Sequence, residues 1–171
     1  MTSIFADYSF EGFWDESDYA LRAYVSAQTP SDKLIKQIED ELGYKFPASY
    51  IEFMKLHNGG TPHYNCIYLE DEEYPLQITG FFCLGDESKT YSLVRSHNRM
   101  VIGWEYPATG IYICDSPSAG HDMFMLDYEG CEAGEEPQVV NVDQEGDYEK
   151  IVVAQTFEEF IRKLEVDRGD E

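Results

Sequence analysis

Residues 31–60 read SDKLIKQIEDELGYKFPASYIEFMKLHNGG, and this stretch carries the signals of two consecutive helices. Ser31 is a favourable N-cap residue, and Gly43 is a favourable residue for ending a helix. Between them the apolar side chains recur every three or four positions, at Leu34, Ile35, Ile38 and Leu42. This period predicts a helix over residues 31–42 that buries one of its faces.

The second half of the stretch predicts another helix, over residues 47–57. Pro47 is a residue favoured in the first turn of a helix. The apolar side chains that follow it are Tyr50, Ile51, Phe53 and Met54. Asn58-Gly59-Gly60 then ends the segment, because glycine lets the chain leave a helix through positive φ.

Beyond this stretch the periodicity of the sequence changes. From about Ile67, short apolar segments are bounded by Gly, Pro and Asp, which is typical of a mostly antiparallel sheet. The predicted strands span residues 67–69, 76–84, 101–105, 110–114, 123–128, 138–142 and 151–154. Short helices are expected near residues 18–25 and within residues 88–99.

The two ends of the chain differ in character. Residues 1–30 are rich in aromatic side chains, and we expect them to pack on the rest as an N-terminal extension. Thr156 and Glu159 form a capping box before an apolar stripe, which predicts a C-terminal helix over residues 156–165. Residues 166–171 are mostly charged, and we expect this tail to fray.

The order of the predicted elements is helices, sheet and helix, and this order predicts an α+β fold. The N-terminal helices and the C-terminal helix are expected to pack on one face of the sheet. A chain of 171 residues fits a single domain, so we expect one domain over residues 1–171. The side chains expected to be largely buried are Ile38, Phe53, Trp104 and Phe160.

The charge of the chain is strongly negative, with 12 Lys and Arg residues against 34 Asp and Glu residues and a formal net charge of -22. Such a charge repels phosphates, so neither nucleic acid nor an anionic membrane is an expected partner. It attracts basic proteins and accelerates their encounter. The alternative interpretation is that the acidity only keeps the protein soluble.

The cysteines give no sign of a metal site or of secretion. Cys66, Cys83, Cys114 and Cys131 lie far apart, with no CxxC pair and no histidine at ligand spacing. The first residues lack the basic region of a signal peptide, and no apolar run of about 18 residues occurs. We therefore expect a cytoplasmic protein with reduced thiols, no metal and no other cofactor.

Several short motifs stand in order along nearly the whole chain: Phe13-Trp14-Asp15, Glu41-Leu42-Gly43-Tyr44, Phe46-Pro47, Ser49-Tyr50, Asn58-Gly59-Gly60, Ile78-Thr79-Gly80, Gly103-Trp104, Gly110-Ile111, Ser118-Ala119-Gly120-His121-Asp122, Leu126-Asp127 and Thr156-Phe157-Glu158-Glu159-Phe160. Taken in this order, the motifs resemble the SUKH superfamily, in particular its Smi/Knr-like family. The resemblance implies a SUKH-like α+β fold.

The resemblance also implies a function in protein binding. Bacterial members look like cytoplasmic immunity proteins, which bind and neutralise a cognate polymorphic toxin, often a nuclease or a deaminase. This is the function we expect. Fungal relatives look like regulators of cell-wall synthesis, so a regulatory or scaffold protein without a toxin partner is the alternative. The superfamily is not enzymatic, and the resemblance implies no catalytic residues.

Ser118, His121 and Asp122 combine a nucleophile, a base and a carboxylate within five residues. A catalytic triad requires the three side chains to converge, whereas adjacent residues entering a strand point to opposite faces. We therefore expect a turn here and no enzymatic activity. Residues 141–147 are spaced like the start of a calcium loop, but Val152 stands where the loop requires an acid, so a hairpin is expected.

Two groups of acidic residues are candidates for binding a partner. Glu70, Asp71, Glu72 and Glu73 are four consecutive acids after a predicted strand. They form either a solvated loop or an anionic ridge that meets the Lys and Arg residues lining the nucleic-acid groove of a toxin. The second group, Glu132, Glu135 and Glu136, is a weaker candidate of the same kind.

Overall fold

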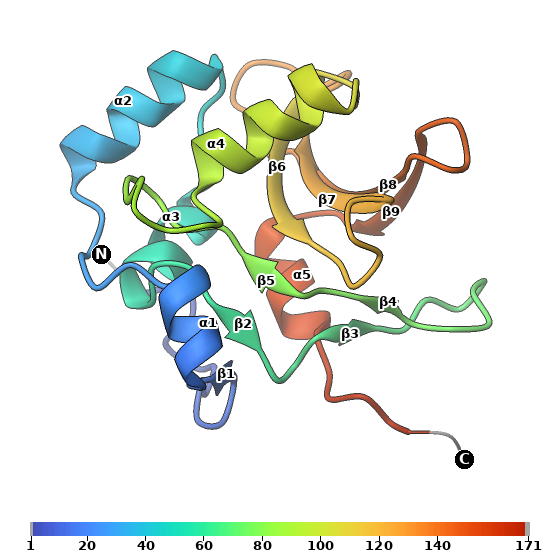
Figure 1. Cartoon of the computed structure of the whole chain (residues 1–171), viewed down its shortest axis with the longest axis horizontal. Helices are drawn as coiled ribbons and strands as arrows, with labels where there is room; N and C mark the ends of the chain where they lie inside the picture. The colour runs from blue at the N-terminus through green and yellow to red at the C-terminus, as the bar shows by residue number, and fades with distance from the viewer. Residues whose placement is uncertain (1, 170–171) are drawn as a thin grey trace.

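A computed structural model describes residues 2–169 of the chain. The helices are α1 (Asp18–Ala23), α2 (Asp32–Leu42), α3 (Ala48–Leu56), α4 (Leu93–Asn98), the π-helix η1 (Arg99–Gly103) and α5 (Phe157–Lys163). The strands are β1 (Trp14–Asp15), β2 (Thr61–Pro62), β3 (Cys66–Ile67), β4 (Leu76–Gln77), β5 (Gly80–Phe81), β6 (Gly110–Asp115), β7 (Asp122–Asp127), β8 (Gln138–Asp143) and β9 (Glu149–Ala154). The predicted α+β class is confirmed (Figure 1).

The strands β5 to β9 form one antiparallel sheet in which neighbours in sequence are neighbours in space. In its centre, Met125 of β7 stands opposite Val140 of β8, and Val140 stands opposite Val152 of β9. A shift of register between Tyr112 and Cys114 marks a bulge in β6. The pairs β1–β2 and β3–β4 form two small antiparallel sheets beside it.

Both faces of the five-stranded sheet are covered. On one face, Phe124 of β7 contacts Phe160 of α5, with ring centroids 6.0 Å apart, and α3 packs on α5. Successive side chains of a strand point to opposite faces, so Met123 lies on the other face, where it shares a cavity with Trp104. α3 and α5 therefore cover one face, whereas α4 and η1 cover the other (Figure 1).

The helical stretch has the caps that its sequence predicts. The Ser31 side chain accepts a hydrogen bond from the Leu34 N–H at 3.1 Å, and Gly43 ends α2 with a φ of 85°. After α3, Gly59 has a φ of 84°, and a Cβ atom there would lie 2.3 Å from the Tyr24 carbonyl oxygen. Only glycine therefore fits this point, where the chain turns toward the sheet.

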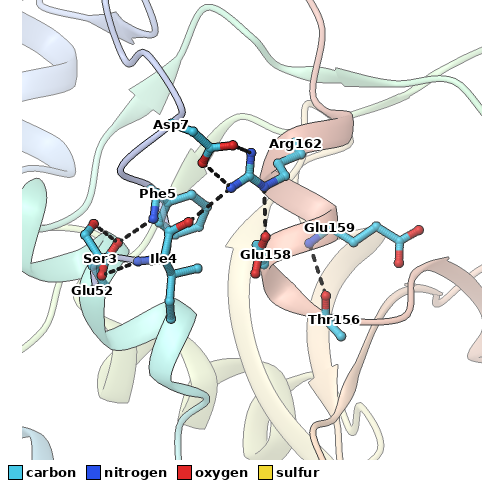
Figure 2. Close-up of polar contacts among 9 residues, drawn as sticks. All are labelled: Ser3, Ile4, Phe5, Asp7, Glu52, Thr156, Glu158, Glu159 and Arg162. Carbon is cyan, nitrogen blue, oxygen red and sulfur yellow. Dashed lines mark hydrogen bonds and ion pairs between the residues drawn. The ribbon is translucent and has the colours of Figure 1, made fainter. Parts of the chain in front are cut away.

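The first residues of the chain are fastened to α3 and α5 (Figure 2). Glu52 of α3 accepts hydrogen bonds from the N–H groups of Ile4 and Phe5, each at 2.9 Å. Arg162 of α5 pairs with Asp7 at 2.9 Å and donates to the Ile4 carbonyl at 3.1 Å. These contacts hold the aromatic N-terminal segment against the two helices of one layer.

The prediction of a strand over residues 101–105 is wrong, because most of this segment belongs to η1. The Trp104 N–H donates to the carbonyls of Arg99 and Met100, so the helix that begins at Leu93 continues instead of giving way to a strand. Val101 and Ile102 favour strands by propensity, but the packing of Met100 into the core outweighs that preference.

Two further details differ from the sequence-based expectations. Trp104 is only partly buried, because its ring lines a cavity, whereas Ile38, Phe53 and Phe160 are buried as predicted. The segment 76–84, predicted as one strand, is divided into β4 and β5. The division arises because β4 pairs with β3 while β5 pairs with β6, so the chain changes partners between them.

Candidate binding surfaces

Glu70, Asp71, Glu72 and Glu73, which we call the acidic ridge, lie in the loop between β3 and β4. All four residues are exposed, and the neighbouring Tyr74 is 74% exposed. The loop extends away from the body of the domain (Figure 1). None of the ion pairs within residues 2–169 involves the ridge, so its negative charge faces the solvent uncompensated.

The acidic ridge borders a groove of about 400 Å³. Its acidic lining comes from Glu72 of the ridge, from Asp122 at the start of β7, and from Asp143 and Glu145 at the β8–β9 turn. The Asn141 side chain donates to Asp122 Oδ2 at 2.7 Å and holds that carboxylate in place. The fold thus joins the ridge to acidic residues that the sequence does not connect with it.

Ser118, His121 and Asp122 line the same groove but do not form a triad. Ser118 Oγ bonds to Ser116 Oγ at 2.7 Å and accepts a hydrogen bond from the Asp122 N–H at 2.9 Å. His121 Nδ1 contacts Gln144 Oε1 at 3.3 Å, and in the described part of the chain no hydrogen bond joins it to Ser118 or Asp122. The segment is a turn closed by side-chain bonds.

Glu132, Glu135 and Glu136 are exposed in the loop between β7 and β8. They border a different groove, of about 510 Å³, whose wall includes the stacked rings of Tyr44 and Tyr128, 4.6 Å apart. Partial loss of hydration and the negative charge of Glu158 raise the pKa of Glu136. The structure therefore places the two acidic groups on separate grooves and does not bring them together.

A third site, a cavity of about 230 Å³, lies between α4, η1 and the sheet. Its apolar walls are formed by Phe82, Tyr91, Met100, Trp104 and Met123. Ser96, Arg99 and Asp115 supply polar side chains. The sequence does not reveal this site, because its residues come from distant segments; the single local signal is Asp115, a carboxylate directly after the buried run of β6.

Asp115 is held in this cavity by two neutral donors. The Tyr24 hydroxyl donates to Oδ2 at 2.8 Å, and the Gly80 N–H donates to Oδ1 at 3.0 Å. Burial raises the pKa of Asp115 to about 6, although both hydrogen bonds and the positive charge of Arg99 act in the opposite direction. Within residues 2–169, no cationic side chain lies close enough to Asp115 to form an ion pair.

Residues 2–169 contain no cluster of three or more His, Cys, Asp or Glu side chains arranged to hold a metal ion. No helix in this range has the length and apolar character that crossing a membrane requires.

A comparison with protein families matches residues 32–161 to the family SUKH_6, described as SMI1-KNR4 cell-wall. The match begins with α2 and ends within α5, so it includes both acidic groups and the cavity. No curated protein matches the chain.

Proposed function

The chain belongs to the SMI1-KNR4 family of the SUKH superfamily, and from this membership we propose that it is a non-enzymatic, cytoplasmic protein of the immunity type. In this proposal it binds a cognate toxin domain of basic character, a nuclease or a deaminase. It neutralises the toxin by covering the active site or the groove that receives nucleic acid.

The observation that carries the proposal is the acidic ridge with its adjoining groove. A domain that acts on nucleic acid lines its substrate groove with Lys and Arg, because these residues neutralise phosphates. The ridge presents four consecutive exposed acidic residues without ion pairs in the described chain, and the groove adds Asp122, Asp143 and Glu145. Such a row of carboxylates imitates the charge of a phosphate backbone.

The alternative is a regulatory scaffold protein without a toxin partner. It is supported by the description of the matching family, which names the cell wall. The two proposals differ in what the protein binds: one toxin domain in the first case, and components of cell-wall synthesis in the second.

The test begins with the genes next to that of this protein. If a toxin domain is encoded there, co-expression of the full chain is expected to restore growth of cells that produce the toxin. The purified proteins are expected to elute from size-exclusion chromatography as one complex. A toxin domain that still arrests growth, and that elutes separately from this protein, would exclude it as the partner and favour the regulatory alternative.

A further inference from the structure

The cavity contains the carboxylate of Asp115, which forms no ion pair in the described chain. The Asp115 carboxylate receives hydrogen bonds from the Tyr24 hydroxyl and the Gly80 N–H, both of them neutral. A largely buried charge without an ion-pair partner is costly, because the protein replaces only part of the lost hydration. The raised pKa of Asp115 reflects this cost. A cation entering the cavity would relieve it.

A second polar group in the cavity also lacks a partner. Ser96 of α4 is 3% exposed and lines the cavity, and its hydroxyl oxygen makes no hydrogen bond within residues 2–169. Buried hydroxyl groups are normally hydrogen-bonded. The Ser96 oxygen itself is closed to solvent, so it accepts a hydrogen bond from the N–H group of a ligand beside Asp115 only after its side chain turns into the cavity.

The walls of the cavity suit a cation as well. Trp104 and Tyr91 line it, and indole and phenol rings attract ammonium and guanidinium groups. The volume of about 230 Å³ is below the roughly 300–1,000 Å³ typical of pockets for drug-sized ligands. The cavity therefore fits the end of one side chain better than it fits a cofactor.

We propose that this cavity binds the cationic end of a lysine or arginine side chain that the protein partner inserts. The source of the side chain rests on the proposed function, in which the partner is basic. The inserted side chain would reach the cavity from the groove bordered by the acidic ridge, because Ser116 lines both the cavity and that groove.

Arg99 is expected to oppose the binding of a cation in this cavity. It lines the cavity, is exposed, and forms no ion pair in the described chain, and its positive charge acts on Asp115. An incoming cation competes with this charge. Replacing Arg99 with Gln is therefore expected to strengthen the binding of a cation, whereas loss of a merely supportive residue would weaken it.

The cation site can be tested without any partner. N-acetyl-lysine amide and N-acetyl-arginine amide carry only the side-chain charge, and N-acetyl-norleucine amide is the uncharged control. In an NMR titration of the full chain, both cationic probes are expected to shift the Trp104 indole N–H signal saturably, and the control is not. Saturable binding of the control with equal affinity, or no saturable binding of either cation, would overturn the proposal.

Variants separate the cavity from the rest of the fold. Ser96→Ala is expected to weaken cation binding by about tenfold, since a hydrogen bond to a charged group is lost. Ser49→Ala is the matched control, because the Ser49 hydroxyl on α3 is also buried without a partner but lies outside the cavity. Arg99→Gln is expected to bind the probes more tightly, and weaker binding would contradict the competition argument.

The source of the cation is tested separately, with the complex itself. If the toxin complex forms but Ser96→Ala and Arg99→Gln leave its dissociation rate unchanged, the insertion of a partner side chain is wrong even when the probes bind. If the probes bind as expected but no toxin is neutralised, the cation site stands and the proposed function fails.

Discussion

His97 is a buried histidine on α4 whose neutral form is part of the native structure. Its Nδ1 accepts a hydrogen bond from the Tyr112 N–H at 3.2 Å, which requires that this nitrogen carry no proton. Burial lowers the pKa of His97 from 6.5 to about 4. As the pH falls below 6.5, the unfolded chain therefore takes up a proton that the folded chain refuses, and stability is lost.

Replacing His97 with Asn is expected to remove this acid sensitivity, because the Asn side-chain oxygen can accept the same hydrogen bond. Between pH 7 and pH 5, the free energy of unfolding of the native protein should fall relative to that of His97→Asn by about 2 kcal/mol. Urea titrations of both proteins at the two pH values measure the difference. If the two proteins differ in free energy of unfolding by the same amount at pH 7 and at pH 5, His97 does not cause the loss of stability in acid.

Asp115 acts on stability in the opposite direction. Burial raises its pKa from 3.8 to about 6, so below pH 6 the folded chain binds a proton more readily than the unfolded chain does. Its contribution to stability increases as the pH falls from about 6 toward 4. The wild-type profile therefore contains two opposed effects, and the comparison with His97→Asn is needed to separate them.

At the scale of elements, the N-terminal segment depends on one carboxylate of α3. Glu52 accepts hydrogen bonds from the N–H groups of Ile4 and Phe5 and from the Ser3 hydroxyl, and the two backbone bonds and the hydroxyl bond lower its pKa despite the opposing effect of burial (Figure 2). Glu52→Ala is expected to reduce the free energy of unfolding by about 1–2 kcal/mol. Hydrogen exchange should accelerate at Ile4 and Phe5.

Glu41→Ala is the matched control for this change, since Glu41 is an exposed acid on α2 whose side chain makes no hydrogen bond or ion pair in the described chain. It should leave both the stability and the exchange of Ile4 and Phe5 unchanged. Equal effects of the two substitutions would show that the hydrogen bonds from Glu52 to the N-terminal segment do not contribute to stability.

The elements that sequence reasoning located correctly are those with local signals. Ser31 and Thr156 cap their helices through bonds to residues three positions along, and Gly43 ends α2 within the same stretch. The prediction of a strand over residues 101–105 was wrong because the apolar residues of this segment favour strands, whereas its conformation is set by the packing of Met100 in the core.

The candidate sites also differ in whether a local sequence signal reveals them. The acidic ridge was recognisable because its four residues are consecutive, and its exposure follows from its position between two short strands. The cavity could not be predicted, because Tyr24, Gly80, Ser96 and Asp115 meet only after the sheet and α4 are in place. Sequence reasoning thus located the charges, and the fold showed which of them lack counter-charges.

At the scale of the whole molecule, most of the Lys and Arg side chains already form ion pairs with acidic side chains of the same chain. The Lys and Arg residues that form ion pairs are Lys36, Lys45, Lys55, Arg95, Lys150, Arg162, Lys163 and Arg168. With a formal net charge of -22, the remaining negative charge lies on residues such as the acidic ridge. Long-range attraction of this kind acts mainly on association, whereas a buried contact such as the proposed cavity acts on dissociation.

Reversing Glu70, Glu72 and Glu73 to Lys is therefore expected to slow association with the cognate toxin by at least about tenfold at low salt. The matched control reverses Glu132, Glu135 and Glu136 to Lys, which changes the net charge by the same amount on the other groove. Stability should change little, because exposed substitutions usually alter it by within about 0.5 kcal/mol each. Stopped-flow association at two salt concentrations measures the effect.

The comparison of the two variants decides where the partner approaches. If only the ridge variant slows association and loses most of the salt dependence, the partner meets the ridge first, because screening weakens only the charges that attract it. If only the control variant does so, the partner approaches the groove of Tyr44 and Tyr128. Equal slowing would point to the overall charge, and two unchanged rates would mean that the acidity serves solubility alone.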